Sequence, residues 1–318
     1  MTPTLESEEW LRFMRNEYLD TFVKEGGATI KYPIALREEI IPSLRDGLIR
    51  NAEESGYLVA HVDAANTKVQ MMDQIFFRIA EQIPWRIICE KVILKLAAQH
   101  GYIMPLDGEK PLIIRIAEAN HVTVETVQLS IRPLIEKNIL KYYKYAKEFR
   151  IALTHLCSMI LAKESDMDYM EAILMAWLTG KLRSVSDLKS YGIYNRINRT
   201  NARFMFESLL RWIRFGDYSG LMVVMDIRRL SVSRNPRNDK LYYTKAQLLD
   251  AYETLRQFMD SLERLKGFFM VVIPDIDFIN EDSFSRGIGL YQALRFRVVN
   301  EIHDRERVNP MATMIEIG

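Results

Sequence analysis

The chain has 318 residues, of which 48% are hydrophobic and 27% charged, and its formal net charge is +1. This is the balance of a globular protein with one large domain or two ordinary ones. The near-neutral charge excludes a global electrostatic field that would draw the protein to nucleic acid or to a membrane. Any contact with nucleic acid must therefore come from a local patch.

Cysteine usage and the absence of targeting patterns bear on the compartment. Cys89 and Cys157 each lie in an apolar helical stretch, which predicts two buried thiols in a reducing compartment. Neither the cysteines nor the five histidines have the spacing of a metal site. The sequence begins without a signal-peptide pattern, and no apolar run approaches ~20 residues. We expect a cytoplasmic protein with no membrane segment and no metal site.

The first part of the chain alternates between helices and strands. Apolar periodicity predicts helices at 8–24, 36–55 and 68–82, and strands at 28–34 and 57–63. The second strand begins with a continuous apolar run, as a buried parallel strand would. This order of elements indicates an α/β layout with a parallel sheet.

From about 86 to 215 the pattern becomes helical. Residues 112–119 predict a short helix, and Thr123 caps a second helix that continues through Ile135. Residues 138–145 and 148–151 then look like two β-strands. Helix, turn, helix and β-ribbon is the order of a winged helix.

The last part returns to the α/β pattern. Helices are predicted at 167–179, 184–190 and 199–215, followed by a buried strand at 220–226 that ends in Asp226. Residues 227–243 form a basic loop. Thr244 and Gln247 make a capping box for a long helix, and a second buried strand covers 268–273.

The strand ending in Asp226 has the Walker B form, in which the acid holds Mg²⁺ and a following glutamate polarises the attacking water. Ile227, Arg228 and Arg229 follow here, so that glutamate is absent. Any buried strand can end in an aspartate, and this alternative stays open. The phosphate cradle G-x-x-x-x-G-K-[ST] is also missing, because residues 34–39 contain no glycine, lysine or hydroxyl.

Four segments in a shared order carry a family resemblance: 17–31, 176–193, 218–226 and 286–297. In them the chain resembles the ATP-binding P-loop proteins of BREX-type phage-defence systems. The resemblance implies a P-loop NTPase-like core of the AAA+/ASCE type. The chain departs from the family at the G-x-x-x-x-G-K-T motif and at the acid after Asp226. Because it ends at Gly318, just past an expected strand at 311–317, we also expect the family's helical lid to be shortened or absent.

We therefore expect an α/β, P-loop NTPase-like parallel-sheet core with a helical, winged-helix-like insertion. Residues 1–100 would form the first part of the core and 101–165 the insertion. Residues 166–318 would form the second part, which contains the Walker-B-like strand.

Two sets of residues are candidates for contacts with partners. Arg286, Arg295 and Arg297 could reach a neighbouring subunit's nucleotide as arginine fingers. Alternatively, Arg295 and Arg297 are solvated and pair with Glu301 and Asp304. The candidates for DNA binding are basic residues that alternate with tyrosines or lie in the basic loop. They are Lys137, Lys141, Lys144, Lys147, Arg150, Arg228, Arg229, Arg234 and Arg237. A strand with one wet face, a protein-docking module and a solvated loop are the alternatives.

Three functions fit these features. The first is a non-hydrolysing ATPase-like subunit that serves as an assembly or DNA-binding scaffold in a phage-defence or DNA-modification complex. The second is an active ATPase, or one completed by a partner, and only this function requires ATP and Mg²⁺. The third is a winged-helix DNA-binding regulator. Other subunits, DNA and further copies of the chain are the expected partners.

Overall fold

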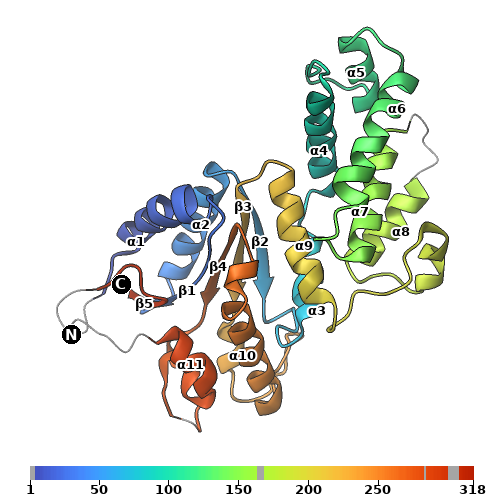
Figure 1. Ribbon diagram of the computed structural model, residues 1–318. Coiled ribbons are helices and arrows are strands. Elements are labelled where there is room, and N and C mark those ends of the chain that lie inside the picture. The colour runs from blue at the N-terminus through green and yellow to red at the C-terminus, as the bar shows by residue number, and fades with distance from the viewer. Residues whose placement is uncertain (1–3, 163–167, 283, 300–307) are drawn as a thin grey trace. The chain divides into compact units, whose positions relative to one another are not determined.

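The computed structural model describes residues 4–162, 168–282, 284–299 and 308–318 (Figure 1). The chain forms two compact units. Unit 1 contains Met1–Gln82 and Tyr218–Gly318, and unit 2 contains Ile83–Asp217. The sheet therefore belongs to a unit built from both ends of the chain, and a helical unit is inserted between them.

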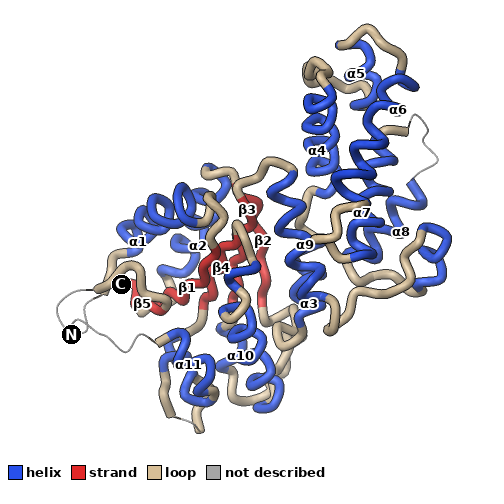
Figure 2. Tube along the Cα trace, viewed as in Figure 1, coloured by secondary structure: helices blue, strands red, loops and turns tan. Residues whose placement is uncertain are grey.

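Unit 1 is built on a five-stranded sheet, which Figure 2 shows in red. Its strands, in spatial order, are β2 (Tyr57–Asp63), β3 (Gly220–Asp226), β4 (Phe268–Ile273), β1 (Ala28–Ala35) and β5 (Met314–Ile317). All neighbouring strands are parallel. Residues of β3 and β4 are buried on both faces, which explains their continuous apolar sequences. All five predicted strands of this core are confirmed.

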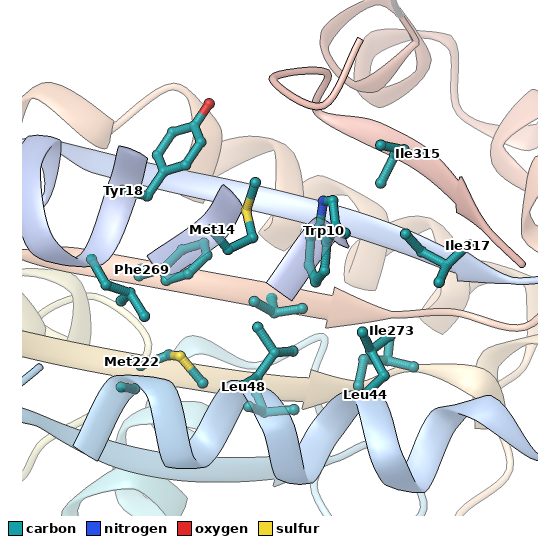
Figure 3. Close-up of a cluster of buried hydrophobic side chains, with 14 of the residues drawn as sticks. Trp10, Met14, Tyr18, Leu44, Leu48, Met222, Phe269, Ile273, Ile315 and Ile317 are labelled. Carbon is teal, nitrogen blue, oxygen red and sulfur yellow. The ribbon is translucent and has the colours of Figure 1, made fainter. Parts of the chain in front are cut away.

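Helices cover both faces of this sheet. On one face, α1 (Ser7–Phe13), the π-helix Met14–Phe22 and α2 (Ile40–Glu54) form a core with alternate residues of β3 and β4 (Figure 3). On the other face, Phe258 of α10 (Lys245–Met259) stacks on Phe268 of β4, with ring centroids 6.1 Å apart. Two further α-helices of the unit are α3 (Met72–Ala80) and α11 (Gln292–Val298), and short 3-10 helices follow β3, α10 and β4. The result is a three-layer α/β fold.

Two predicted helix starts in unit 1 can be compared with the structure, those of α10 and α2. Thr244 and Gln247 form the predicted capping box at the start of α10. By contrast, α2 begins at Ile40, four positions after the predicted start at residue 36. The connection from β1 to α2 is therefore a short exposed turn at 36–39.

Every described residue of unit 2 lies in a helix, turn or loop. Its α-helices are α4 (Trp85–His100), α5 (Leu112–Ala119), α6 (Val124–Ile135), α7 (Lys147–Ile160), α8 (Asp168–Leu178) and α9 (Ala202–Phe215). A π-helix, Glu136–Leu140, extends α6, and the 3-10 helix Val185–Tyr191 follows α8. The predicted pair at 112–119 and 123–135 is confirmed, and the Thr123 side chain accepts a hydrogen bond from the Thr126 N–H.

The predicted β-ribbon at 138–145 and 148–151 was wrong. These residues form the end of the π-helix, a turn and the first turns of α7. The alternation of Lys and Tyr has the same two-residue period as a strand with one solvent-exposed face. The buried residues Tyr145, Phe149 and Leu153, however, recur every four positions, which is a helical period. Of the predicted winged-helix order, the structure therefore contains the two helices, α5 and α6, but not the β-ribbon.

Candidate nucleotide site at the carboxyl edge of the sheet

Two aspartates meet where β2 and β3 end. The parallel register places Asp63 beside Asp226, and the Ala64 N–H donates to the backbone oxygen of Asp226 over 2.9 Å. The carboxyl edge of a parallel sheet is where α/β proteins usually bind ligands. Sequence reasoning singled out Asp226 but missed Asp63, although both end a largely apolar strand.

The Asp226 carboxylate is bound by a guanidinium from its own chain. Arg228 Nη2 lies 2.6 Å from Asp226 Oδ2, and Arg228 Nε lies 3.1 Å from both carboxylate oxygens. The Arg228 N–H adds a fourth bond, to Oδ1, over 3.0 Å. This bonding to Asp226 raises the pKa of Arg228, and the negative charges of Glu38 and Asp63 add to the effect. The acid that would hold Mg²⁺ in an ATPase is thus neutralised by a cation that cannot lose its proton.

The start of α2 offers few donors to a phosphate. The N–H groups of Ile40 and Ile41 donate to the carbonyls of Arg37 and Glu38 over 3.2 and 3.1 Å, and Pro42 has no N–H. Glu38 and Glu39 are exposed at this end of the helix, where their charge repels an anion. A phosphate cradle requires free backbone N–H groups at a helix N-terminus. The residues present at β1 and α2 therefore do not fit ATP and Mg²⁺. Pro42 was visible in the sequence and would have strengthened the prediction.

The basic loop after β3 is held at its base. Arg229 Nε donates to the carbonyl of Leu241, and Arg229 Nη2 lies 3.0 Å from Asn238 Oδ1. The Tyr243 hydroxyl lies 2.9 and 2.6 Å from the carbonyl oxygens of Ala64 and Thr67. Two further candidates for DNA binding, Arg234 and Arg237, are exposed in the same loop. Of the four arginines predicted there, the structure places two in internal contacts and two on the surface.

The three candidate finger arginines are all engaged within the chain. Arg286 donates from Nε to the carbonyl of Leu230 over 2.8 Å and from Nη2 to that of Tyr243 over 2.7 Å. Arg295 pairs with Glu281 over 2.7 Å. Arg297 pairs with Asp260. The predicted partners of these last two arginines, Glu301 and Asp304, lie outside the described residues.

The remaining candidates for DNA binding lie in unit 2. Lys137, Lys141, Lys144 and Lys147 are exposed. Lys141 pairs with Glu136 over 2.8 Å. The fifth candidate, Arg150, lies with its guanidinium carbon 4.4 Å from the centre of the Tyr143 ring.

Three further observations concern metal ions, the cysteines and membrane helices. Within the described ranges, no group of three or more His, Cys, Asp and Glu side chains could hold a metal ion. Cys89 and Cys157 are free and buried, as predicted, and burial raises the pKa of the Cys89 thiol. No helix in the part of the chain that the structure describes has the length and apolar character to cross a membrane.

The five-stranded parallel sheet, with helices on both faces and an acid at the end of β3, is consistent with a P-loop NTPase-like core. The sequence matches the family described as BREX system ATP-binding protein BrxC/D over residues 113–318, more than half of the chain. The chain therefore belongs to this family, as its resemblance indicated. No curated protein and no solved structure matches the chain. The family match contains β3, β4 and β5 but begins after β1 and α2.

Proposed function

We propose that this chain is a non-hydrolysing, ATPase-like subunit of a BREX-type phage-defence complex, in which it acts as an assembly or DNA-binding scaffold. Family membership supports the defence setting and implies that other subunits of such a system are its partners. We place its work in the cytoplasm, together with those partners. The observation that carries the proposal is the bond between Asp226 and Arg228.

The physical argument is that phosphoryl transfer depends on positioning and on neutralising charge at the phosphates. Three features oppose it here. The Asp226 carboxylate already has a cationic partner, residues 227–229 contain no glutamate, and the exposed turn before α2 presents the carboxylates of Glu38 and Glu39 where phosphate needs donors. Each feature alone could be compensated. Together they remove the metal ligand, the water-positioning group and the phosphate cradle.

What remains is a rigid α/β core that can support contacts with other proteins. Its strands β3 and β4 are buried on both faces, and Arg229 and Arg286 fix the loop after β3 through backbone carbonyls. A scaffold needs fixed surfaces more than it needs a catalytic centre. Binding of DNA and association with further copies of the chain belong to this proposal.

A second candidate is an ATPase that a partner completes. The paired carboxylates of Asp63 and Asp226 favour it, because they would face a metal ion if Arg228 turned away. Only this candidate requires ATP and Mg²⁺ as cofactors. The third candidate, a winged-helix regulator, has lost its main support because the expected β-ribbon is helical.

The test is single-turnover hydrolysis, with the protein in excess over a trace of radiolabelled Mg·ATP. The matched control is Asp226→Asn, which removes the charge of the Walker-B-like acid. We expect the native chain to release no more phosphate than this variant. Phosphate release by the native chain that Asp226→Asn abolishes would refute the proposal and favour the second candidate.

A further inference from the structure

The turn between the π-helix Glu136–Leu140 and α7 has a fixed backbone. Tyr145 is buried in it, with its ring centroid 5.0 Å from that of Tyr142 and 6.3 Å from that of Phe149. The Ala146 N–H donates to Ser208 Oγ over 2.9 Å, and Arg211 Nη1 donates to the carbonyl of Lys144 over 3.3 Å. Side chains on this turn are therefore presented from a rigid support.

Tyr143 is the most exposed aromatic residue of this turn, since Tyr142 is 38% exposed and Tyr145 is buried. Tyr143 is 77% exposed, and the Arg150 guanidinium lies 4.4 Å from its ring centroid. A cation at this distance is attracted to the ring and helps to hold its orientation. Nε and Nη1 of Arg150 are buried and have no hydrogen-bond partner among the described residues. Arg150 therefore acts at this surface by supporting the Tyr143 ring.

Basic residues flank Tyr143 along the chain. Lys144 follows Tyr143 directly. Lys147 lies three residues before Arg150 in α7, so the side chains of Lys147 and Arg150 are neighbours on the helix surface. Lys137 is exposed in the preceding π-helix. The nearest carboxylate in α7, that of Glu148, is buried and accepts a hydrogen bond from Asn195 over 2.5 Å. The carboxylate of Glu136, in the preceding π-helix, is exposed and pairs with Lys141 over 2.8 Å. Lys137, Lys144 and Lys147 therefore supply the positive charge that is available to a ligand.

We propose that this Tyr143 surface (Lys137, Tyr143, Lys144, Lys147 and Arg150) binds single-stranded nucleic acid. The lysines contact backbone phosphates, and an unpaired base stacks on Tyr143. Stacking on aromatic side chains beside a basic surface is how proteins hold single strands without reading their sequence. A duplex keeps its bases stacked inside and cannot offer one to the ring, so the geometry favours a single strand.

This inference deepens the DNA-binding part of the proposed function and rests on it. The two are nevertheless separable, because the Tyr143 surface lies in unit 2 and the altered nucleotide site lies in unit 1. Loss of strand binding would leave the argument about Asp226 and Arg228 intact. Tight Mg·ATP binding would likewise leave the proposal for the Tyr143 surface unaffected.

The experiment measures fluorescence anisotropy of labelled oligo-dT and oligo-U, each about 16 nucleotides long, with the full chain. A duplex of equal length is the third probe. Tyr143→Ala should weaken binding of the single strands by ~5–150-fold, the range found when a stacking residue is truncated. Tyr143→Phe keeps the ring and should bind like the native chain. The matched control is Tyr194→Ala, which removes another exposed tyrosine of unit 2.

Charge is tested by salt dependence. The slope of log affinity against log salt concentration is negative. Lys147→Glu should reduce its magnitude by about 0.7, the value for one phosphate contact on a single strand. Lys189→Glu, an exposed lysine elsewhere in unit 2, should leave that slope unchanged. The two single-stranded probes separate DNA from RNA as the source of the strand, and binding of either supports the proposal. No binding of single strands by the native chain, equal binding by Tyr143→Ala, or tighter binding of the duplex would overturn it.

Discussion

Lys31 gives unit 1 a pH dependence that a single substitution should remove. It lies within β1, is only 3% exposed, and its ammonium donates to the Tyr18 hydroxyl over 2.8 Å and to the carbonyl of Met311 over 2.6 Å. Burial lowers the pKa of Lys31 from 10.5 to about 8. Bringing the charged form into the folded state thus opposes folding, and losing the proton relieves this cost.

The direction and size follow from proton binding. Below about pH 8 both the folded and the unfolded state hold the proton on Lys31, whereas between that pH and 10.5 only the unfolded state does. Stability therefore rises with pH inside this window and falls as the pH drops through the folded-state pKa. One pH unit inside the window corresponds to about 1.36 kcal/mol. Raising the pH from about 7 to 9 should stabilise unit 1 by about 1.3 kcal/mol through this group.

Lys31→Met keeps most of the length of the side chain and removes the titrating group. We expect its free energy of unfolding to lack this rise, while Lys68→Met, an exposed lysine of the same unit, keeps it. Comparison with the native chain cancels other groups of unit 1, including Tyr32, whose raised pKa acts in the opposite direction. Pulsed hydrogen exchange along a urea series, read on β1 and β4 peptides, isolates the transition of unit 1. An equal rise in the native chain and in Lys31→Met would refute the reasoning.

Two further predictions concern backbone contacts in unit 1. Arg286→Met removes both donors that fix the loop after β3 and should cost ~1–3 kcal/mol, with faster hydrogen exchange at 228–243 in mass spectrometry. Unchanged exchange there would contradict the role assigned to Arg286. Gly220→Ala should cost more than about 2 kcal/mol in urea unfolding, since an added Cβ would lie 1.9 Å from the carbonyl oxygen of Gly267. Its control is Gly108→Ala, whose Cβ would meet Arg115 Cδ at an ordinary 3.6 Å, and equal losses in the two variants would count against this argument.

The sequence predicted the core of unit 1 well because its signals are local. A run such as Phe268–Ile273 is apolar throughout, short and rich in aromatic and β-branched residues, and this pattern is typical of a strand buried on both faces. The turn before α7 shows where local reading fails. Lys141–Tyr145 alternates in polarity as a strand would, and the decisive contact, Tyr145 on Phe149, depends on a helix that has already formed. The division of the chain at 100/101 and 165/166 stays a prediction.

For the candidate site, the sequence predicted that residues of the phosphate-binding motif are missing. It did not predict the contacts that the residues present make with one another. Missing glycines and lysine can be read from residues 34–39, so a lost phosphate cradle is visible without a structure. The bond from Arg228 to Asp226 is not visible in this way, because a basic residue after a strand serves equally well as a surface charge. The same holds for Arg286, whose partners Leu230 and Tyr243 lie 56 and 43 positions away.

The central claim is that this family member no longer binds Mg·ATP in a form that can be hydrolysed, and calorimetric titration tests it most directly. The titration uses Mg·ATP with the native full chain and with Asp226→Ala. The account predicts that neither protein binds more tightly than about 1 mM, the weak end of the usual range for enzyme substrates. Micromolar binding by the native chain that Asp226→Ala abolishes would contradict it, and would mean that Arg228 yields the carboxylate to a metal-bound nucleotide.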